Sequence, residues 1–271
     1  MTVTITDDFD LTKIADSGQA FRVVPAGDGW RFVTGHRLLH MTQKSAHRYE
    51  VDCSRWTWDH FWHSYFDLDR NYAAIRAEIP PEDAYLCGAA LAGQGIRILR
   101  QDPWETLVTF IISQRKSIPA IRSCVETLCD SLGTPLAEEQ GRLLHSFPTA
   151  QALCDASAQT LRSCALGYRL PYVQAAAQAV ASGTLDLNRL ADLPDEELLD
   201  SLMQVYGVGV KVANCVALFA YGRVSCAPVD VWIARVVEEH YGGKNPFPRY
   251  GNAGILQQYM FYEARTHKIS H

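Results

Sequence analysis

The stretch that decides the fold is DEELLDSLMQVYGVGVKVANCVALFAYG, residues 195–222. Apolar residues recur at helical spacing on both sides of a central glycine pair. They are Leu198, Leu202 and Val205 before the glycines and Val212, Cys215, Val216 and Phe219 after them. Gly207 and Gly209 permit a tight reversal and let another backbone approach closely. The stretch therefore predicts two helices joined by a glycine turn.

The beginning of the second helix is a predicted anion site. The first N–H groups of a helix have no partner within it, and they point outward beside the turn. A DNA phosphate suits such a helix end. We therefore expect Gly207, Gly209 and Val210 to contact a DNA backbone, and a structural cation held by turn carbonyls could assist them. The plain alternative is an αα-hairpin with a glycine turn and no ligand.

Lys211 makes the hairpin a candidate for chemistry. It lies in the first turn of the second helix, where the helix dipole disfavours a cation, and its neighbours Val210, Val212 and Ala213 are apolar. Both features favour the uncharged amine. A neutral amine is a nucleophile that can form a Schiff base. The alternative is a surface lysine whose stem covers apolar atoms while its head stays in water.

Asp230 is the second candidate for chemistry. It lies in CAPVDVW, residues 226–232, where a helix is predicted to begin just after Pro228. Aspartate at a helix start is most often a cap. A carboxylate close to an amine nucleophile can also stabilise positive charge that develops on a sugar as its base leaves.

The rest of the chain divides into two parts with different patterns. Residues 1–52 contain short runs such as WRFVTG and HRLLHMTQ and are predicted to be strands. After Ser54 the apolar residues follow helical spacing, and almost everything to the C-terminus is predicted to be helix. The expected class is α+β, with a small antiparallel β-rich part followed by a larger all-α part.

The net charge of −5 argues against a nucleic-acid partner, because DNA-binding proteins usually carry a basic excess. The objection is met if backbone N–H groups and helix N-termini hold the phosphates with the help of few lysines.

The cysteines and the N-terminus indicate a cytoplasmic protein. Eight cysteines occur in the 271 residues, none in a CxxC pair, and several stand within apolar helical runs, so we expect reduced thiols and no metal site. No stretch is long and apolar enough to cross a bilayer. The first residues also lack the basic and apolar segments of a secretion signal.

The hairpin, Lys211 and PVDVW together resemble the helix–hairpin–helix DNA glycosylases that have a Gly/Pro-rich loop and a following aspartate. Within them the chain is most similar to a bacterial branch of the 8-oxoguanine DNA glycosylases. Further blocks match in the family's order: SGQAFR, GIRILRQDPWETLVTFIISQ, LGYRLPYV and YGNAGILQQYMF. The resemblance implies an N-terminal TBP-like β domain, residues 1–85, packed on a helical glycosylase domain, residues 86–271. The latter contains the helix–hairpin–helix at 196–220, and its cleft lies between two helical subdomains.

The resemblance also assigns the catalytic pair. Lys211 corresponds to the Schiff-base nucleophile and Asp230 to the catalytic carboxylate. The implied enzyme is bifunctional: it excises the oxidised base and then nicks the abasic strand by β-elimination. This chemistry requires no metal or redox cofactor.

A second set of residues corresponds to the family's base pocket. The Gly18 carbonyl matches the acceptor for the N7 hydrogen that 8-oxoguanine has and guanine lacks, and a buried acceptor that faced a lone pair would be left unpaired. Gln257 matches the residue that recognises the Watson–Crick edge, and Phe261 and Cys215 match the two walls. Trp232 stands where the eukaryotic branch has a histidine. The alternatives are that Gly18 is a simple turn residue and that Phe261 and Cys215 belong only to the hydrophobic core.

A third set corresponds to the surface that grips the opened duplex, since the base must leave the stack to be recognised. Gln114 and Arg115 stand at the gap-filling position, and Arg115 stands where the eukaryotic branch has asparagine. Tyr168 matches the wedge and Arg169 the residue that recognises the opposite cytosine; a loop tyrosine and a solvated arginine are the alternative. Ala120 stands at the second cytosine-recognising arginine position. We therefore predict a weaker preference for cytosine than in the eukaryotic branch.

The expected partner is damaged double-stranded DNA, bound by a monomer with no membrane contact. One alternative is a glycosylase of the same fold for another base. Many adenine and thymine-glycol enzymes hold an iron–sulfur cluster with four closely spaced C-terminal cysteines, whereas no cysteine follows Cys226. Alkylbase glycosylases typically lack the hairpin lysine. The other alternative is a non-catalytic DNA-binding module, against which Lys211 and Asp230 both weigh.

Overall fold

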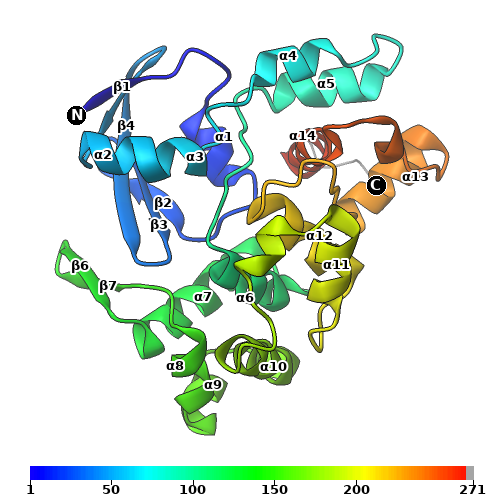
Figure 1. The fold of residues 1–271 in the computed structure, drawn as a ribbon. Coiled ribbons are helices and arrows are strands. Elements are labelled where there is room, and N and C mark those ends of the chain that lie inside the picture. The colour runs from blue at the N-terminus through cyan, green and yellow to red at the C-terminus, as the bar shows by residue number, and fades with distance from the viewer. Residues whose placement is uncertain (267–271) are drawn as a thin grey trace.

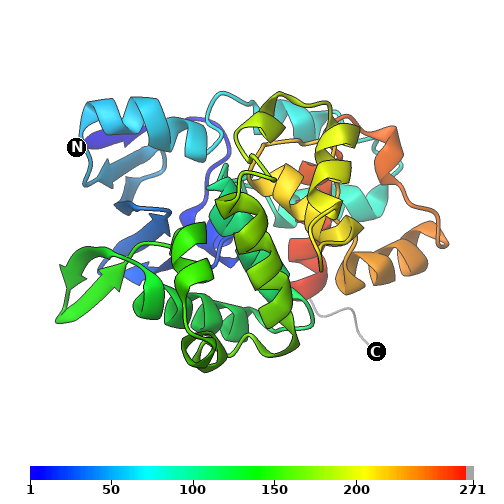
Figure 2. The same cartoon turned by 60° about the horizontal axis from the view of Figure 1, so that its bottom comes forward.

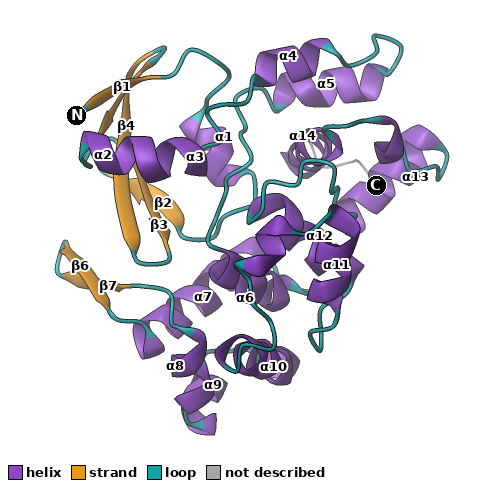
Figure 3. Cartoon of the chain, viewed as in Figure 1, coloured by secondary structure: helices purple, strands orange, loops and turns teal. Residues whose placement is uncertain are grey.

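A computed structural model describes residues 1–266 as a small sheet beside a larger helical body (Figures 1 and 3). The strands are β1 Thr2–Thr4, β2 Val23–Ala26, β3 Gly29–Thr34, β4 Arg37–Ser45, β5 Arg48–Val51, β6 Pro135–Glu139 and β7 Arg142–His145. The helices are α1 Leu11–Asp16, α2 Arg55–Thr57, α3 His63–Tyr65, α4 Tyr72–Ala77, α5 Ala84–Ala92, α6 Pro103–Ser113, α7 Ile118–Leu132, α8 Ala150–Asp155, α9 Ala158–Ser163, α10 Leu170–Ala181, α11 Asp195–Met203, α12 Val210–Phe219, α13 Val231–Tyr241 and α14 Ala253–Thr266. A π-helical turn, Trp58–Trp62, joins α2 to α3, and 3₁₀ turns lie at Gly167–Arg169, Arg189–Asp192 and Phe247–Arg249. The predicted α+β architecture is confirmed.

The N-terminal sheet has five strands in the order β1-β5-β4-β3-β2, all antiparallel to their neighbours. Successive side chains of each strand point to opposite faces of the sheet, so one set faces inward. This buried set is Val3, Phe32, Leu39, Met41, Tyr49 and Val51. Figure 1 shows α2 and α3 crossing this sheet, and the aromatic residues of that segment complete its core: Trp58, Trp62, Tyr65 and Phe66. The sheet therefore has a hydrophobic core of its own.

The helical body is built around α6, whose residues Glu105–Ile112 are all buried. Helices α7, α10 and α12 pack against it, and α14 packs against α5 and α13. The predicted division at residues 85 and 86 falls inside α5, and Tyr72 of α4 and Leu86 of α5 both belong to the core of the helical body. Within residues 1–266, no helix combines the length and the apolar character needed to cross a membrane.

Two local expectations are wrong. The region predicted to be strands contains α1, a helix of six residues that begins where the Asp10 carboxylate accepts from the Lys13 N–H at 3.0 Å. One and a half turns are too short to show a helical period. The region predicted to be all helix contains the hairpin β6–β7, which turns at Gln140 and Gly141 with φ of 50° and 77°. A two-residue hairpin turn of this kind requires positive φ at both positions. The chain forms this turn within a region whose neighbouring elements are helices.

The β6–β7 hairpin lies beside the sheet (Figure 2), and Arg142 and His145 of β7 each pair with Asp130 of α7 at 3.1 Å. Glu139 at the end of β6 accepts from Arg31 of β3 at 2.9 Å and pairs with His40 of β4 at 2.8 Å. The hairpin therefore connects the helical body to the sheet through charged side chains.

Arg97 fixes the segment that leads from α5 to α6. Its guanidinium is fully buried and donates to the Phe66 carbonyl at 3.1 Å, to the Asp7 carboxylate at 3.0 Å and to the Asp8 carbonyl at 2.9 Å. Because a buried charge is stable only when paired, these bonds hold the sheet side and the helical side together. The same segment borders the turn that carries Gly18, whose neighbour Gln19 donates to the Arg97 carbonyl at 2.8 Å.

Candidate active site

The glycine turn between α11 and α12 has one crowded and one open position. Gly207 has a φ of +88°, and a Cβ there would lie 2.2 Å from Cγ of Tyr172, so a larger residue does not fit. Gly209 caps α12 with extended backbone, and a Cβ there would meet no atom within 4 Å. Among residues 1–266, no side chain caps the N-terminus of α12. The first N–H groups of this helix are therefore available at an open surface.

Lys211, in the first turn of α12, is half-buried and turned toward α6. Its Nζ lies 5.3 Å from the centre of the Phe110 ring, which stacks on Phe219 at 5.4 Å. A lysine ammonium over an aromatic ring is attracted by the electron-rich face of that ring. The side chain is thereby held over an aromatic floor inside a pocket.

This pocket brings together residues that lie far apart in the sequence. Lys211 lines it with the other predicted catalytic and base-binding residues Gly18, Cys215, Asp230, Gln257 and Phe261. The cavity is about 50 Å³ and adjoins a hollow of about 420 Å³, which Lys211, Gly18 and Phe261 also line. Trp232 lines this outer hollow and not the inner cavity.

Asp230 has the position expected of a helix cap and also faces the pocket. Its Oδ1 accepts from the N–H groups of Trp232 at 3.0 Å and Ile233 at 2.9 Å, at the beginning of α13. Both bonds use the same oxygen, so the cap leaves Oδ2 for another partner. Within one pocket, the carboxylate and the Lys211 amine are thus presented from the ends of two different helices.

The predicted walls of the pocket differ in polarity. Gln257 is 3% exposed, and within residues 1–266 its buried Oε1 has no hydrogen-bond partner. A Cβ on Gly18 would lie 3.0 Å from Cε1 of Phe261, so the ring packs directly on the glycine backbone. Burial raises the pKa of Cys215 to about 11 although Lys211 opposes that shift, so this wall is a neutral thiol. The pocket is apolar apart from a few groups that converge on it, which is typical of a ligand site.

Several residues of this site were not predicted from the local sequence. Phe110 forms the floor beneath Lys211, Arg265 lies 5.7 Å from the centre of the Phe261 ring, and Gln258 binds the Ser17 carbonyl at 2.5 Å. Helical spacing could have placed Phe110 on the inner face of α6. Nothing local distinguishes Gln258 from its neighbour Gln257, because only the folded chain shows what each amide meets.

The predicted DNA-gripping residues form one cluster outside the pocket. Gln114, which ends α6, donates from Nε2 to the Gly207 carbonyl at 3.0 Å. Its own carbonyl accepts from Arg169 Nε at 2.7 Å and from the Tyr168 hydroxyl at 3.3 Å. Arg169 is only 6% exposed, so its guanidinium is bound within the protein and not solvated. Arg115 is exposed at the loop tip with a φ of 51°.

The turn carbonyls have limited capacity for the predicted cation. The Val205 carbonyl accepts from the Val208 N–H at 2.9 Å, and the Gly207 carbonyl accepts from Gln114. Each carbonyl keeps a second lone pair, so the cation stays a prediction. In the part of the chain that the structure describes, no group of three or more His, Cys, Asp or Glu residues is arranged to hold a metal ion. All eight cysteines are free.

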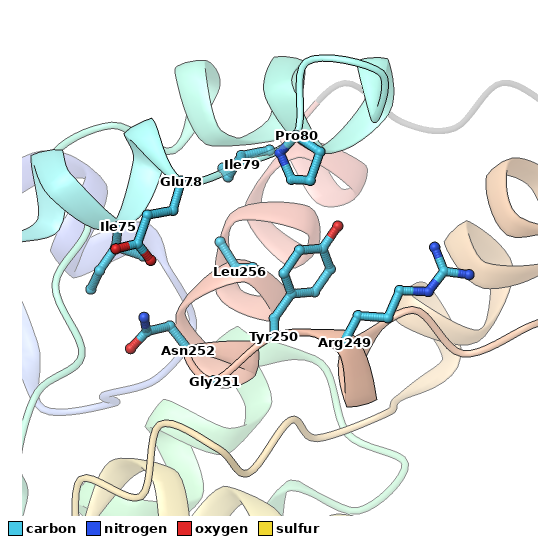
Figure 4. A pocket seen from close by; sticks show the side chains of 9 residues that line it. All are labelled: Ile75, Glu78, Ile79, Pro80, Arg249, Tyr250, Gly251, Asn252 and Leu256. Carbon is cyan, nitrogen blue, oxygen red and sulfur yellow. The ribbon is translucent and has the colours of Figure 1, made fainter.

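A separate hollow of about 290 Å³ lies between the α4–α5 segment and the beginning of α14. Figure 4 shows the Tyr250 ring pointing toward Pro80, with Glu78 and Asn252 on the other side of the opening. Leu256 of α14 lines this hollow, whereas the next residue, Gln257, lines the lysine pocket. None of the predicted site residues lines this second hollow.

Two family models together cover most of the chain. The model described as the 8-oxoguanine DNA glycosylase N-terminal domain matches residues 2–107. The model of the HhH-GPD superfamily of base excision DNA repair proteins matches residues 108–250, which is more than half of the chain. The glycine hairpin, Lys211 and Asp230 lie in the second match.

Individual relatives give the same result. The chain is 33% identical over 190 residues to an N-glycosylase/DNA lyase of Saccharomyces cerevisiae, a match that covers 65% of this chain and 50% of the yeast protein. The structure of MBOgg1 in complex with a low affinity DNA ligand is 36% identical, with a TM-score of 0.91, over 97% of this chain and 94% of that one. The 8-oxoguanine glycosylase/lyase of Clostridium acetobutylicum, in complex with double-stranded DNA containing cytosine opposite 8-oxoguanine, is 29% identical, with a TM-score of 0.90, over 99% of each chain.

Proposed function

Because this chain belongs to the 8-oxoguanine DNA glycosylase family of the HhH-GPD superfamily, we propose that it excises 8-oxoguanine from double-stranded DNA and then cleaves the abasic strand. The observation that carries the proposal is the shared pocket of Lys211, Asp230, Gly18 and Gln257. A nucleophile, a carboxylate and groups for recognising a base are the parts that such a reaction needs.

The damaged base is recognised by groups that guanine cannot satisfy. The flipped base lies between Phe261 and Cys215, with the Gly18 carbonyl accepting its N7 hydrogen and the Gln257 amide, whose Oε1 has no partner within residues 1–266, bonding its Watson–Crick edge. Guanine presents a lone pair at N7, which leaves the buried carbonyl unpaired. Such a loss is a strong basis for discrimination, because the site was desolvated to receive a donor.

The chemistry starts from the uncharged amine of Lys211. Its Nζ forms a bond to C1′ of the deoxyribose, and the bond between C1′ and N9 breaks, with the electron pair leaving on the base, which takes up a proton. The Asp230 carboxylate stabilises the positive charge on the sugar. The sugar ring opens to a Schiff base, and loss of a C2′ proton with departure of the 3′ phosphate cuts the strand.

The duplex is held mainly by backbone groups. The first N–H groups of α12, beside the open Gly209 position, donate to a phosphate, and this accounts for DNA binding by a chain of net charge −5. Tyr168, half exposed, fills the space beside the extruded base, together with Gln114 and Arg115. Damaged double-stranded DNA is thus the proposed partner. A monomeric, cytoplasmic protein remains our expectation.

Borohydride trapping tests the nucleophile. A duplex with one 8-oxoguanine should give a covalent adduct with the protein, and an undamaged duplex should give none. Lys211→Gln should abolish the adduct because an amide cannot form a Schiff base. An adduct that survives this substitution would identify another nucleophile, and DNA binding without any incision would favour the non-catalytic module.

Asp230→Asn tests the carboxylate without disturbing the helix start. Asparagine caps helices as well as aspartate does, so the bonds to Trp232 and Ile233 are retained while the charge is removed. The variant should bind DNA normally and lose most of its excision rate. Full activity in the variant would remove the role assigned to the charge.

A further inference from the structure

We propose that Gln258 is a positioning residue, which holds the Gly18 carbonyl where it distinguishes 8-oxoguanine from guanine. Its side chain is buried on α14 and lines the pocket beside Gln257, and its Nε2 donates to the Ser17 carbonyl at 2.5 Å. The inference rests on the proposed function and adds a residue that acts on the base through the backbone.

The carbonyls on both sides of Gly18 are already bonded. The Ser17 carbonyl accepts from Gln258 Nε2, and the Gln19 carbonyl accepts from Gln101 Nε2 at 2.9 Å. Within residues 1–266, no donor contacts the Gly18 carbonyl between them. Because adjacent peptide planes are rigid, fixing both neighbours restricts the direction of the middle carbonyl. The one carbonyl left without a donor belongs to the residue that lines the pocket.

Helix α14 carries the opposite side of the same recognition site. Gln257 lines the pocket, its buried Oε1 has no hydrogen-bond partner within residues 1–266, and Phe261 packs on Gly18. The adjacent residue Gln258 binds the Gly18 turn directly. One rigid helix therefore sets the spacing between the two groups that contact the base, which a site of high selectivity requires.

The turn itself has a separate anchor. The Gln19 amide is buried and fully bonded: Nε2 donates to the Ser17 hydroxyl and to the Arg97 carbonyl, each at 2.8 Å, and Oε1 accepts from the Leu99 N–H at 2.7 Å. These bonds do not involve Gln258. Loss of the Gln258 amide should therefore loosen the direction of the Gly18 carbonyl without unfolding the turn.

The experiment compares two reactions of one enzyme. Excision of 8-oxoguanine requires the Gly18 carbonyl, whereas cleavage of a duplex with a preformed abasic site involves no base and requires only the lysine chemistry. Gln258→Met keeps the length of the side chain and removes the donor. We expect its single-turnover excision rate to fall about 10-fold, with abasic cleavage within about twofold of wild type, because small misplacements of a positioning group are costly.

Two further variants make the result specific. Gln101→Met removes the donor on the other side of Gly18. It should likewise lower the excision rate and leave the rate of abasic cleavage nearly unchanged. Gln151→Met removes one glutamine hydrogen bond on α8, to Asp155, and should change neither reaction. Circular dichroism of each variant reports whether it is folded.

The outcomes separate the inference from the proposed function. An equal fall of both reactions in the Gln258 and Gln101 variants, or an unchanged excision rate, overturns the positioning role. If the wild-type protein cleaves abasic DNA and leaves 8-oxoguanine in place, the proposed substrate is wrong, whatever Gln258 does.

Discussion

Two glycine turns border Lys211, and they differ in how their polar groups are satisfied. Gly18 and Gly207 both have positive φ, +77° and +88°. The Gly18 turn is buried, and glutamine side chains bind the carbonyls on both sides of the glycine. The hairpin turn is exposed: Tyr206 is 65% and Val210 66% accessible, and Gly209 borders open space.

The difference shows how one residue type serves two purposes. A turn whose neighbours are fully bonded is rigid, so its single free carbonyl can distinguish two similar bases. A turn with free N–H groups at the surface can receive a phosphate of any sequence, because phosphate contacts position the duplex without specifying it. The inner turn should therefore govern selectivity, and the outer turn stability and DNA affinity.

Gly18→Ala should have the largest effect, at the inner turn. The new methyl group would lie 3.0 Å from Phe261 and 3.3 Å from Ile118, at a φ that side chains rarely adopt. We expect excision of 8-oxoguanine to fall at least about 100-fold, since the pocket narrows and the carbonyl turns. Single-turnover excision measures this, with cleavage of preformed abasic DNA as the control. A wild-type rate would show that the inner turn does not govern recognition.

Gly207→Ala should destabilise the outer turn. Its Cβ would overlap Tyr172 at 2.2 Å, and with the positive φ the free energy of unfolding should fall by about 2–3 kcal/mol. Gly209→Ala is the matched control: its Cβ meets open space, so stability should fall only by the cost of a poorer helix cap, less than about 1 kcal/mol, while DNA affinity falls. Urea denaturation and a DNA titration measure the two effects. Equal stabilities for the two variants would contradict this interpretation.

Glu105 is a buried carboxyl on α6 that gives the stability of the protein a pH dependence. Its carboxylate accepts from the Gly35 N–H at 2.6 Å, and burial raises its pKa from 4.5 to about 7 although Arg22 opposes that shift. The folded state therefore holds the proton more tightly, so this contribution is complete below pH 4.5 and is lost as pH rises through 7. Relative to Glu105→Gln, the wild type should lose about 2 kcal/mol of unfolding free energy over that range. Parallel pH profiles for the two proteins would argue against the raised pKa.

The preference for the opposite base should show the smallest effect. Ala120 stands at one position for recognising cytosine, and Arg169 is bonded to the Gln114 carbonyl. Because one of the two cytosine-recognising arginines is absent, excision rates with the four opposite bases should differ by less than about 10-fold. A glycosylase assay on four duplexes measures this. Strict dependence on cytosine would show that Arg169 leaves its internal partner and suffices alone.

Much of the site was predictable because its local signals are strong. The apolar spacing around Gly207 and Gly209 predicts the hairpin, and the structure has it. Asp230 begins α13 as the position after Pro228 indicates. The hydrogen bonds of Arg169 and Gln114 were not predictable, since each joins groups that are 55 or 93 residues apart.

The sequence alone determined the helix–hairpin–helix, the lysine in the first turn of its second helix, the capping aspartate and the α+β order of the chain. These depend on backbone preferences and on apolar periods within a few turns. Gln257 and Gln258 both line the pocket, and only the tertiary structure decided that Gln258 binds Ser17, 241 residues away, while the Gln257 Oε1 has no partner within residues 1–266. Adjacent helical residues point about 100° apart, so which one reaches the base depends on how α14 is packed against the rest of the protein.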